Sequence, residues 1–243
     1  MTLTEKEREF YQRFSEEKRR KHKRLITVSQ TLSLERLYHP DGKHLGSLVS
    51  GLSGSGKTTA VITTLQQAIR SPKFGESHRF IIIDPKTQNG DYDLISEPLL
   101  SVDDAMKSIR KNRVTLFWLD EASILITPTK IPNSLKRLSL QGRAKRIKPV
   151  FISQRPIINR WTDANMSNLI LFNTMPVDYD TLSRRWGVDF DNHAENMRTT
   201  PYSFVWFDME QAKFYPMAPV DLPKINFRKK KKGVFKRLFD PLS

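Results

Sequence analysis

The stretch at residues 51–58 carries the clearest chemical signal in this chain, because it fits the pattern G-x-x-x-x-G-K-[ST]. An apolar run precedes it and a helical pattern follows it, so it lies on a turn from a strand to a helix. Backbone N–H groups of such a turn cradle phosphates, and the positive end of the helix dipole adds to the attraction. Lys57 supplies a cation and Thr58 a hydroxyl for Mg²⁺. The predicted contacts with a nucleoside triphosphate are Gly51, Leu52, Ser53, Gly54, Ser55, Gly56, Lys57, Thr58 and Thr59.

An acidic pair, Asp120 and Glu121, follows the apolar run at residues 114–119. At the end of a buried strand, the Asp120 carboxylate is expected to reach the Mg²⁺ shell opposite Thr58, with Glu121 polarising an attacking water. An apolar run at residues 80–83 lies between the loop and this pair, so the strand before Asp120 need not neighbour the strand before the loop. This order favours hydrolysis of a nucleoside triphosphate over phosphoryl transfer to a small acceptor.

The elements that must position these residues alternate between strands and helices. Strands are expected at residues 44–50, 80–83, 114–119, 150–153 and 169–173, and helices after the loop, at 101–111 and at 179–186. A further helix is expected to start at Asn133 or Ser134, to carry Leu135, Leu138 and Ile147, and to end at Pro149. Residues 202–207 and 212–215 alternate like a hairpin. The prediction is an α/β fold with a mainly parallel sheet, helices on both faces and C-terminal hairpin strands.

Composition sets limits on the partners of this protein. The chain has 243 residues, with 41 Lys and Arg against 26 Asp and Glu, for a formal charge of +15. Such an excess points to a polyanionic partner, either nucleic acid or an anionic membrane surface. There is no cysteine, which excludes disulfides and thiolate metal sites. The five histidines show no ligand spacing, and we expect neither a secretion signal nor a membrane span.

Several motifs together resemble the FtsK–HerA superfamily of DNA-pumping ATPases. They are residues 51–58, the run Ile83-Asp84-Pro85-Lys86, residues 116–122, the pair Gly142-Arg143, and residues 151–156. The compact size is most similar to the genome-packaging ATPases of membrane-containing icosahedral viruses with double-jelly-roll capsids. Asp84-Pro85-Lys86 is given no catalytic role, because it is equally compatible with a turn that carries a surface ion pair.

This resemblance implies a RecA-like core, bound ATP and Mg²⁺, and a homo-oligomeric ring, a pentamer or hexamer, that drives double-stranded DNA through its middle. Matched position by position, Lys57 and Thr58 bind phosphate and Mg²⁺, Asp120 holds the metal's water shell, and Glu121 is the catalytic carboxylate. Gln154 becomes the sensor of the γ-phosphate. Arg143 becomes the arginine finger that reaches the neighbouring subunit's ATP, with Lys145 and Arg146 as alternatives on the same predicted helix.

Residues 128–160 contain nine basic side chains and no acidic one. On the resemblance, this part of the core faces the ring axis, where contacts with backbone phosphates give affinity without sequence choice. A channel loop is expected at residues 127–133. The candidate DNA contacts are Lys130, Lys136, Arg137, Lys145 and Arg146.

Three domains are expected: a charged helical extension at residues 1–40, the RecA-like ATPase domain at 41–222, and a basic tail at 223–243. Either end could contact DNA phosphates or a partner, and the tail could also contact an anionic lipid surface. The expected setting is the packaging vertex of a virion or the host cytoplasm, with capsid-vertex or internal-membrane proteins as further partners. The alternatives are an NTPase switch that controls assembly or docking, a cellular DNA-pumping ATPase, and a small-molecule kinase.

Overall fold

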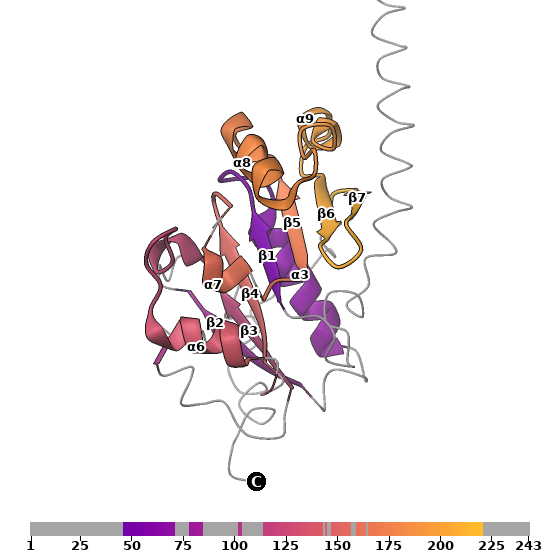
Figure 1. The fold of residues 1–243 in the computed structure, drawn as a ribbon. Coiled ribbons are helices and arrows are strands. Elements are labelled where there is room, and N and C mark those ends of the chain that lie inside the picture. The colour runs from indigo at the N-terminus through magenta and orange to yellow at the C-terminus, as the bar shows by residue number, and fades with distance from the viewer. Residues whose placement is uncertain are drawn as a thin grey trace, which may run out of the picture.

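A seven-stranded sheet forms the centre of the computed structural model, with the strand order β2-β3-β4-β1-β5-β6-β7 (Figure 1). The structure describes residues 46–70, 78–84, 102–103, 114–142, 144, 147–156, 159–163 and 165–220. The strands are β1 (Ser47–Ser50), β2 (His78–Ile83), β3 (Val114–Leu119), β4 (Ile147–Ser153), β5 (Asn168–Phe172), β6 (Phe204–Asp208) and β7 (Lys213–Met217). The expected extension, tail and most of the helix at 101–111 lie outside the described residues.

The first five strands pair in parallel and the last two pair antiparallel. Parallel strands joined by helical crossovers bring their carboxyl ends to one edge of the sheet, where ligands of such folds bind. β4 lies between β1 and β3. The strand of the acidic pair is therefore separated from the strand of the phosphate loop, and the predicted α/β class with C-terminal hairpin strands is confirmed.

Helices cover both faces of the sheet. The described helices are α3 (Lys57–Arg70), α6 (Asn133–Gln141), α7 (Arg160–Asp163), α8 (Pro176–Trp186) and α9 (Glu195–Thr199), with a short 3₁₀ helix, η2 (Ala122–Ile124). One buried cluster joins the sheet to α6, α8 and α9, and a second joins its other face to α3. Continuous apolar runs such as β3 suit this arrangement, because both faces of each central strand are buried.

The predicted helix that was to end at Pro149 is wrong in its second half. α6 ends at Gln141, and Ile147 opens β4, with Pro149 inside that strand. Gly142 ends the helix: its carbonyl accepts a bond from the N–H of Ile147 at 2.8 Å, which turns the chain directly into the strand. The spacing that included Ile147 therefore joined two separate elements.

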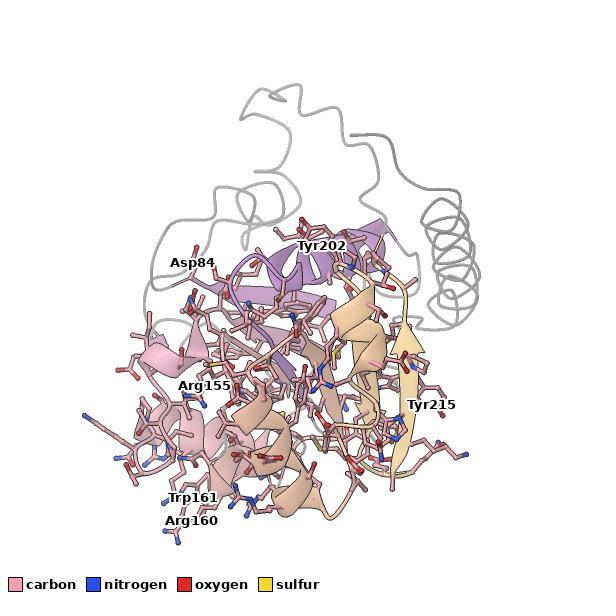
Figure 2. The ribbon with its side chains drawn as sticks, turned by 90° about the horizontal axis from the view of Figure 1, so that it is seen from above. Asp84, Arg155, Arg160, Trp161, Tyr202 and Tyr215 are labelled. Atoms are coloured by element: carbon pink, nitrogen blue, oxygen red, sulfur yellow. The ribbon has the colours of Figure 1, made fainter. Side chains whose placement is uncertain are left out.

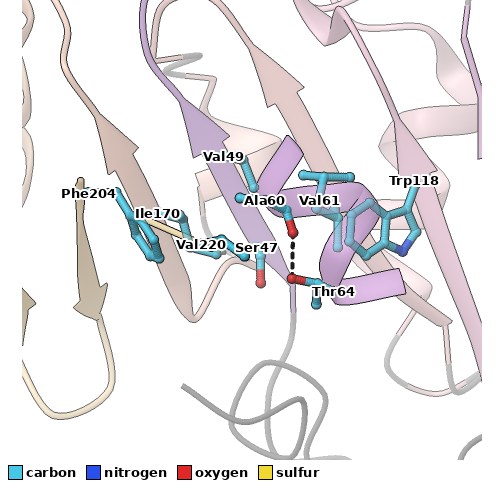
Figure 3. Close-up of a pocket in the computed structure, with 10 residues that line it drawn as sticks. Ser47, Val49, Ala60, Val61, Thr64, Trp118, Ile170, Phe204 and Val220 are labelled. Atoms are coloured by element: carbon cyan, nitrogen blue, oxygen red, sulfur yellow. Dashed lines mark hydrogen bonds between the residues drawn. The ribbon is translucent and has the colours of Figure 1, made fainter. Parts of the chain in front are cut away.

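A small apolar cavity of about 30 Å³ lies under α3, between that helix and β1, β4 and β5 (Figure 3). Ala60, Val61 and Trp118 are among its lining residues, and the Thr64 hydroxyl beside it donates to the Ala60 carbonyl at 2.7 Å. Ligand pockets are typically about ten times larger. The cavity is therefore too small for a typical ligand. Among the described residues, no helix has the length and apolar character needed to cross a bilayer.

Candidate nucleotide-binding site

The loop between β1 and α3 has backbone angles that only glycine adopts without strain. Gly51, Gly54 and Gly56 have φ angles of 152°, 73° and 98°. A Cβ placed on Gly51 would lie 2.5 Å from the Cβ of Phe172, so that position excludes any side chain. The Leu52 N–H donates to the Asn173 carbonyl at 2.8 Å, which ties the loop to the end of β5. The loop is thus held in shape by the neighbouring strand.

The Lys57 side chain folds back over this loop. Its Nζ donates to the carbonyls of Gly51 at 2.7 Å and Leu52 at 2.8 Å, and the residue is buried. Burial lowers the pKa of Lys57, while the nearby charges of Glu121 and Asp120 act to raise it. The ammonium group is therefore already within electrostatic reach of the acidic pair. A phosphate bound at the loop would replace these carbonyls as the hydrogen-bond partner of the Lys57 ammonium group.

The acidic pair stands where the sequence predicts, at the carboxyl end of β3. Asp120 is buried, and its Oδ1 accepts the N–H of Glu121 at 2.8 Å. Glu121 has a left-handed backbone, with φ 46° and ψ 42°. Non-glycine residues in this conformation cost roughly 1 kcal/mol and gather at functional sites. The conformation turns the chain sharply out of the strand, and the Glu121 side chain remains half-buried.

Gln154 follows β4 and meets Glu121. Its Nε2 donates to Glu121 Oε1 at 3.3 Å, from an exposed position. The structure thus brings the Glu121 carboxylate and the Gln154 amide together at the carboxyl ends of β3 and β4. Of these two strands, β4 is the direct neighbour of β1, which leads into the phosphate loop. Thr58 and Thr59 are half-buried at the start of α3.

The loop also suits a bound phosphate chemically. The Ser55 hydroxyl is buried and, among the described residues, has no hydrogen-bond partner. A Cβ on Gly51 would lie 3.0 Å from it, so this hydroxyl faces the inside of the loop. An orphaned donor here fits a phosphate oxygen, and oxygen ligands from Thr58 and Asp120 fit the preferences of Mg²⁺.

An ion-pair network that the sequence did not reveal joins β4 to α8. Arg155 donates from Nη2 to Asp178 Oδ1 at 2.6 Å and from Nε to the same oxygen at 3.1 Å. The Thr174 hydroxyl donates to Asp178 Oδ2 at 2.7 Å. Thr174 follows Asn173, the residue that braces the phosphate loop. The network therefore fixes the carboxyl ends of β4 and β5 on either side of the loop.

The basic run at residues 128–160 is less uniform than the sequence suggests. Lys148 is buried in β4 and does not belong to a solvated basic face, whereas Arg155 is 58% exposed but paired with Asp178. Lys130 and Arg137 are exposed. Lys136 lies with its Nζ 3.8 Å from the ring centroid of Trp161, and the guanidinium carbon of Arg160 lies 4.7 Å from it. Arg143, Lys145 and Arg146 lie outside the described residues.

The expected channel loop begins as a tight turn. The N–H of Thr127 donates to the Lys130 carbonyl at 2.8 Å, and the N–H of Lys130 donates to the Thr127 hydroxyl at 3.0 Å. Asn159 Nδ2 donates to the Thr127 carbonyl at 2.7 Å, which attaches the turn to the segment after β4. The Lys130 side chain is therefore presented to solvent from an ordered position.

The fold and the loop define the class: the chain has the α/β architecture of the P-loop NTPases. Its structure is similar to the genome packaging NTPase B204 of Sulfolobus turreted icosahedral virus 2 in complex with AMPPCP, with a TM-score of 0.58, 14% identity, and coverage of 73% of this chain and 98% of that one. B204 of Sulfolobus turreted icosahedral virus, a DNA-packaging ATPase, matches with a TM-score of 0.56 and 13% identity over 72% of this chain and 97% of that one.

The cytoplasmic domain of the type VII secretion ATPase EccC of Thermomonospora curvata gives a TM-score of 0.51 and 11% identity, over 74% of this chain and 24% of that one. No protein-family model and no curated protein matches the chain. At these identities the comparisons show the fold. They agree with the α/β fold that the motifs predict, since ATPases that package viral DNA are among the matched structures.

Proposed function

We propose that this protein is an ATPase that drives double-stranded DNA and packages a viral genome into a preformed capsid, acting as a homo-oligomeric ring. The observation that carries the ATPase part is the convergence of the loop and the acidic pair. They follow β1 and β3, two parallel strands of one sheet with β4 between them, so both lie at the carboxyl ends of the strands. The packaging part is supported by the similarity to B204, which is described as a genome packaging NTPase.

Each residue of the site has a distinct proposed role. The loop N–H groups and Lys57 bind the phosphates, and Thr58 and Asp120 hold Mg²⁺, which neutralises charge on the phosphates when bound. Glu121 accepts a proton from the attacking water, which is general base catalysis at a carboxylate. Gln154 already contacts this carboxylate, so it holds Glu121 and senses the terminal phosphate.

Arg143 is the proposed arginine finger for the ATP of a neighbouring subunit, with Lys145 and Arg146 as alternatives. The N–H of Ile147 donates a hydrogen bond to the Gly142 carbonyl at the amino end of β4. In the sequence, Arg143, Lys145 and Arg146 lie between these two residues. Gln154 follows the carboxyl end of the same strand. A strand rises about 3.3 Å per residue, so the two ends of β4 are about 20 Å apart. Arg143 follows Gly142 directly in the sequence, and we propose that it serves the site of the next subunit.

The partners follow from the same proposal. Lys130, Lys136 and Arg137 contact DNA phosphates, and Lys145 and Arg146 remain candidates with them. The ring is a pentamer or hexamer, and it docks at a capsid vertex or on internal membrane proteins. Its place is then the packaging vertex of the virion or, before assembly, the host cytoplasm.

The decisive experiment measures ATP turnover of the full chain with and without double-stranded DNA over a series of salt concentrations. A many-fold stimulation that falls steeply with salt is expected, because phosphate contacts release counterions. Glu121→Gln serves as the control, and its turnover should fall by about 100-fold or more, the usual contribution of a general base. ATP hydrolysis without any DNA stimulation would contradict translocation and favour the NTPase switch.

A further inference from the structure

Tyr202 is an aromatic side chain that the fold leaves in solvent. It is 60% exposed and lies two residues before the start of β6. Its φ angle of 62° is left-handed, which is uncommon for a bulky residue and costs roughly 1 kcal/mol. An exposed ring in a strained backbone contributes little to the core. The ring is therefore available for a role outside folding.

The ring of Tyr202 lies against the phosphate loop. A Cβ placed on Gly56 would be 3.3 Å from Cδ1 of Tyr202 and 3.7 Å from Cε1 of Phe172. Phe172 in turn stacks on Phe204, with ring centroids 4.9 Å apart. Figure 2 shows Tyr202 beside α3, the helix that follows the phosphate loop. An exposed aromatic surface thus borders the loop just before Lys57.

The orientation of a bound triphosphate follows from the strands around the loop. Glu121 and Gln154 follow β3 and β4, on one side of β1, whereas Phe172 and Tyr202 belong to the region of β5 and β6, on the other side. The terminal phosphate must lie near Glu121 for hydrolysis. The rest of the nucleotide then crosses the loop and leaves it on the side of β5 and β6, where Tyr202 stands.

We propose that Tyr202 is the platform on which the base of the nucleoside triphosphate stacks. This inference rests on the nucleotide-binding part of the proposed function and is independent of DNA translocation. Stacking on an exposed ring requires only the π-face of the base, so it gives affinity without a specific hydrogen bond. It also favours purines, whose larger rings cover more of the tyrosine.

The test compares a ligand that has a base with one that lacks it. Binding of Mg²⁺–ATP and of inorganic tripolyphosphate is measured by calorimetry on the full chain. Tyr202→Ala is expected to weaken ATP binding about tenfold, near the low end for base–aromatic stacking, with tripolyphosphate binding unchanged. Tyr202→Phe keeps the ring and should stay within about twofold of the parent for both ligands.

Two further variants guard against indirect effects. Tyr202→Gly removes the ring and also relieves the left-handed strain, so it should fold at least as well and lose ATP affinity to the same extent. Tyr215→Ala removes a tyrosine of β7 that stacks on Trp206 at 4.6 Å, and it should leave the affinity for both ligands unchanged.

The outcomes separate the alternatives. Equal losses for ATP and tripolyphosphate in Tyr202→Ala would show that the residue supports the loop and would overturn the stacking proposal. Unchanged ATP binding in that variant would overturn it as well. If the parent chain bound neither ligand, the nucleotide-binding proposal itself would fail, together with this inference. If the parent chain bound ATP but its turnover were not stimulated by DNA, the stacking proposal would be unaffected.

Discussion

At the scale of single residues, Lys57 is the buried cation of the phosphate loop. It donates to two loop carbonyls and is shielded from water, and this burial lowers its pKa despite the charges of Glu121 and Asp120. A bound phosphate would give this cation a negative partner in place of the carbonyls of Gly51 and Leu52. Such a phosphate would offset the cost of burying the Lys57 ammonium group.

The lowered pKa of Lys57 has a measurable consequence for stability. Between the lowered folded value and the ordinary 10.5, the unfolded chain binds more protons, so the contribution of Lys57 to the free energy of unfolding rises with pH. Relative to Lys57→Met, the parent should therefore gain stability as pH rises toward 10.5, by at most about 1.4 kcal/mol per unit. Urea unfolding of both proteins at several alkaline pH values checks this, and a constant difference would contradict it. The Met variant should also lose ATP binding.

At the scale of elements, the tether between β4 and α8 is expected to matter both for stability and for the site. Asp178 is buried and accepts bonds from Thr174 and Arg155. Asp178→Ala leaves the Thr174 hydroxyl buried without this acceptor, which costs about 2 kcal/mol in the free energy of unfolding. Turnover should fall with it, because Gln154 and the brace of the loop are joined through this network. Chemical denaturation and an ATPase assay measure the two effects.

A matched control is available on the surface. Asp191 pairs with Arg198, and both side chains are about half exposed. Asp191→Ala should change stability by less than about 1 kcal/mol, as is typical of exposed ion pairs, and should leave turnover alone. If the two aspartate variants behaved alike, the network at Asp178 would have no structural role beyond that of a surface contact.

The elements show which parts of the fold the sequence could predict. β3 matches its predicted bounds, because an unbroken apolar run ended by charged residues indicates a strand buried on both faces. The prediction missed the first three residues of β4, because proline rarely lies inside a central strand. The register explains its presence: the β1–β4 pairing begins with Ser47 opposite Val150, so Pro149 lies just beyond the ladder with β1.

The site divides in the same way. The phosphate loop and the acidic pair are local patterns, and each could be found from a few adjacent residues. The Arg155–Asp178 pair joins residues 23 positions apart, and the contact between Tyr202 and Gly56 requires β6 to return beside β5. Such neighbours are created by topology, so no local pattern of residue types announces them.

At the scale of the whole molecule, the proposed coupling of DNA binding to hydrolysis requires a physical connection between the Lys130 turn and the nucleotide site. The turn that carries Lys130 has two such connections. It follows η2, which leaves β3 directly after Glu121, and Asn159 attaches it to the segment after β4, which carries Gln154. The Lys130 turn is therefore connected to both strands whose ends hold the proposed catalytic groups.

This arrangement predicts that Lys130→Ala lowers DNA-stimulated turnover, with turnover in the absence of DNA as the reference. If Lys130 contacts a phosphate, the slope of log affinity against log salt concentration should also decrease by about 0.9 for each subunit in contact. Lys213→Ala removes an exposed lysine from β7, at the opposite edge of the sheet, and should alter neither quantity. If both variants lost stimulation equally, the effect would belong to the overall positive charge, and the turn would have no privileged contact with DNA. A loss confined to Lys130→Ala would instead place the DNA on the side of the molecule where β3 and β4 deliver Glu121 and Gln154.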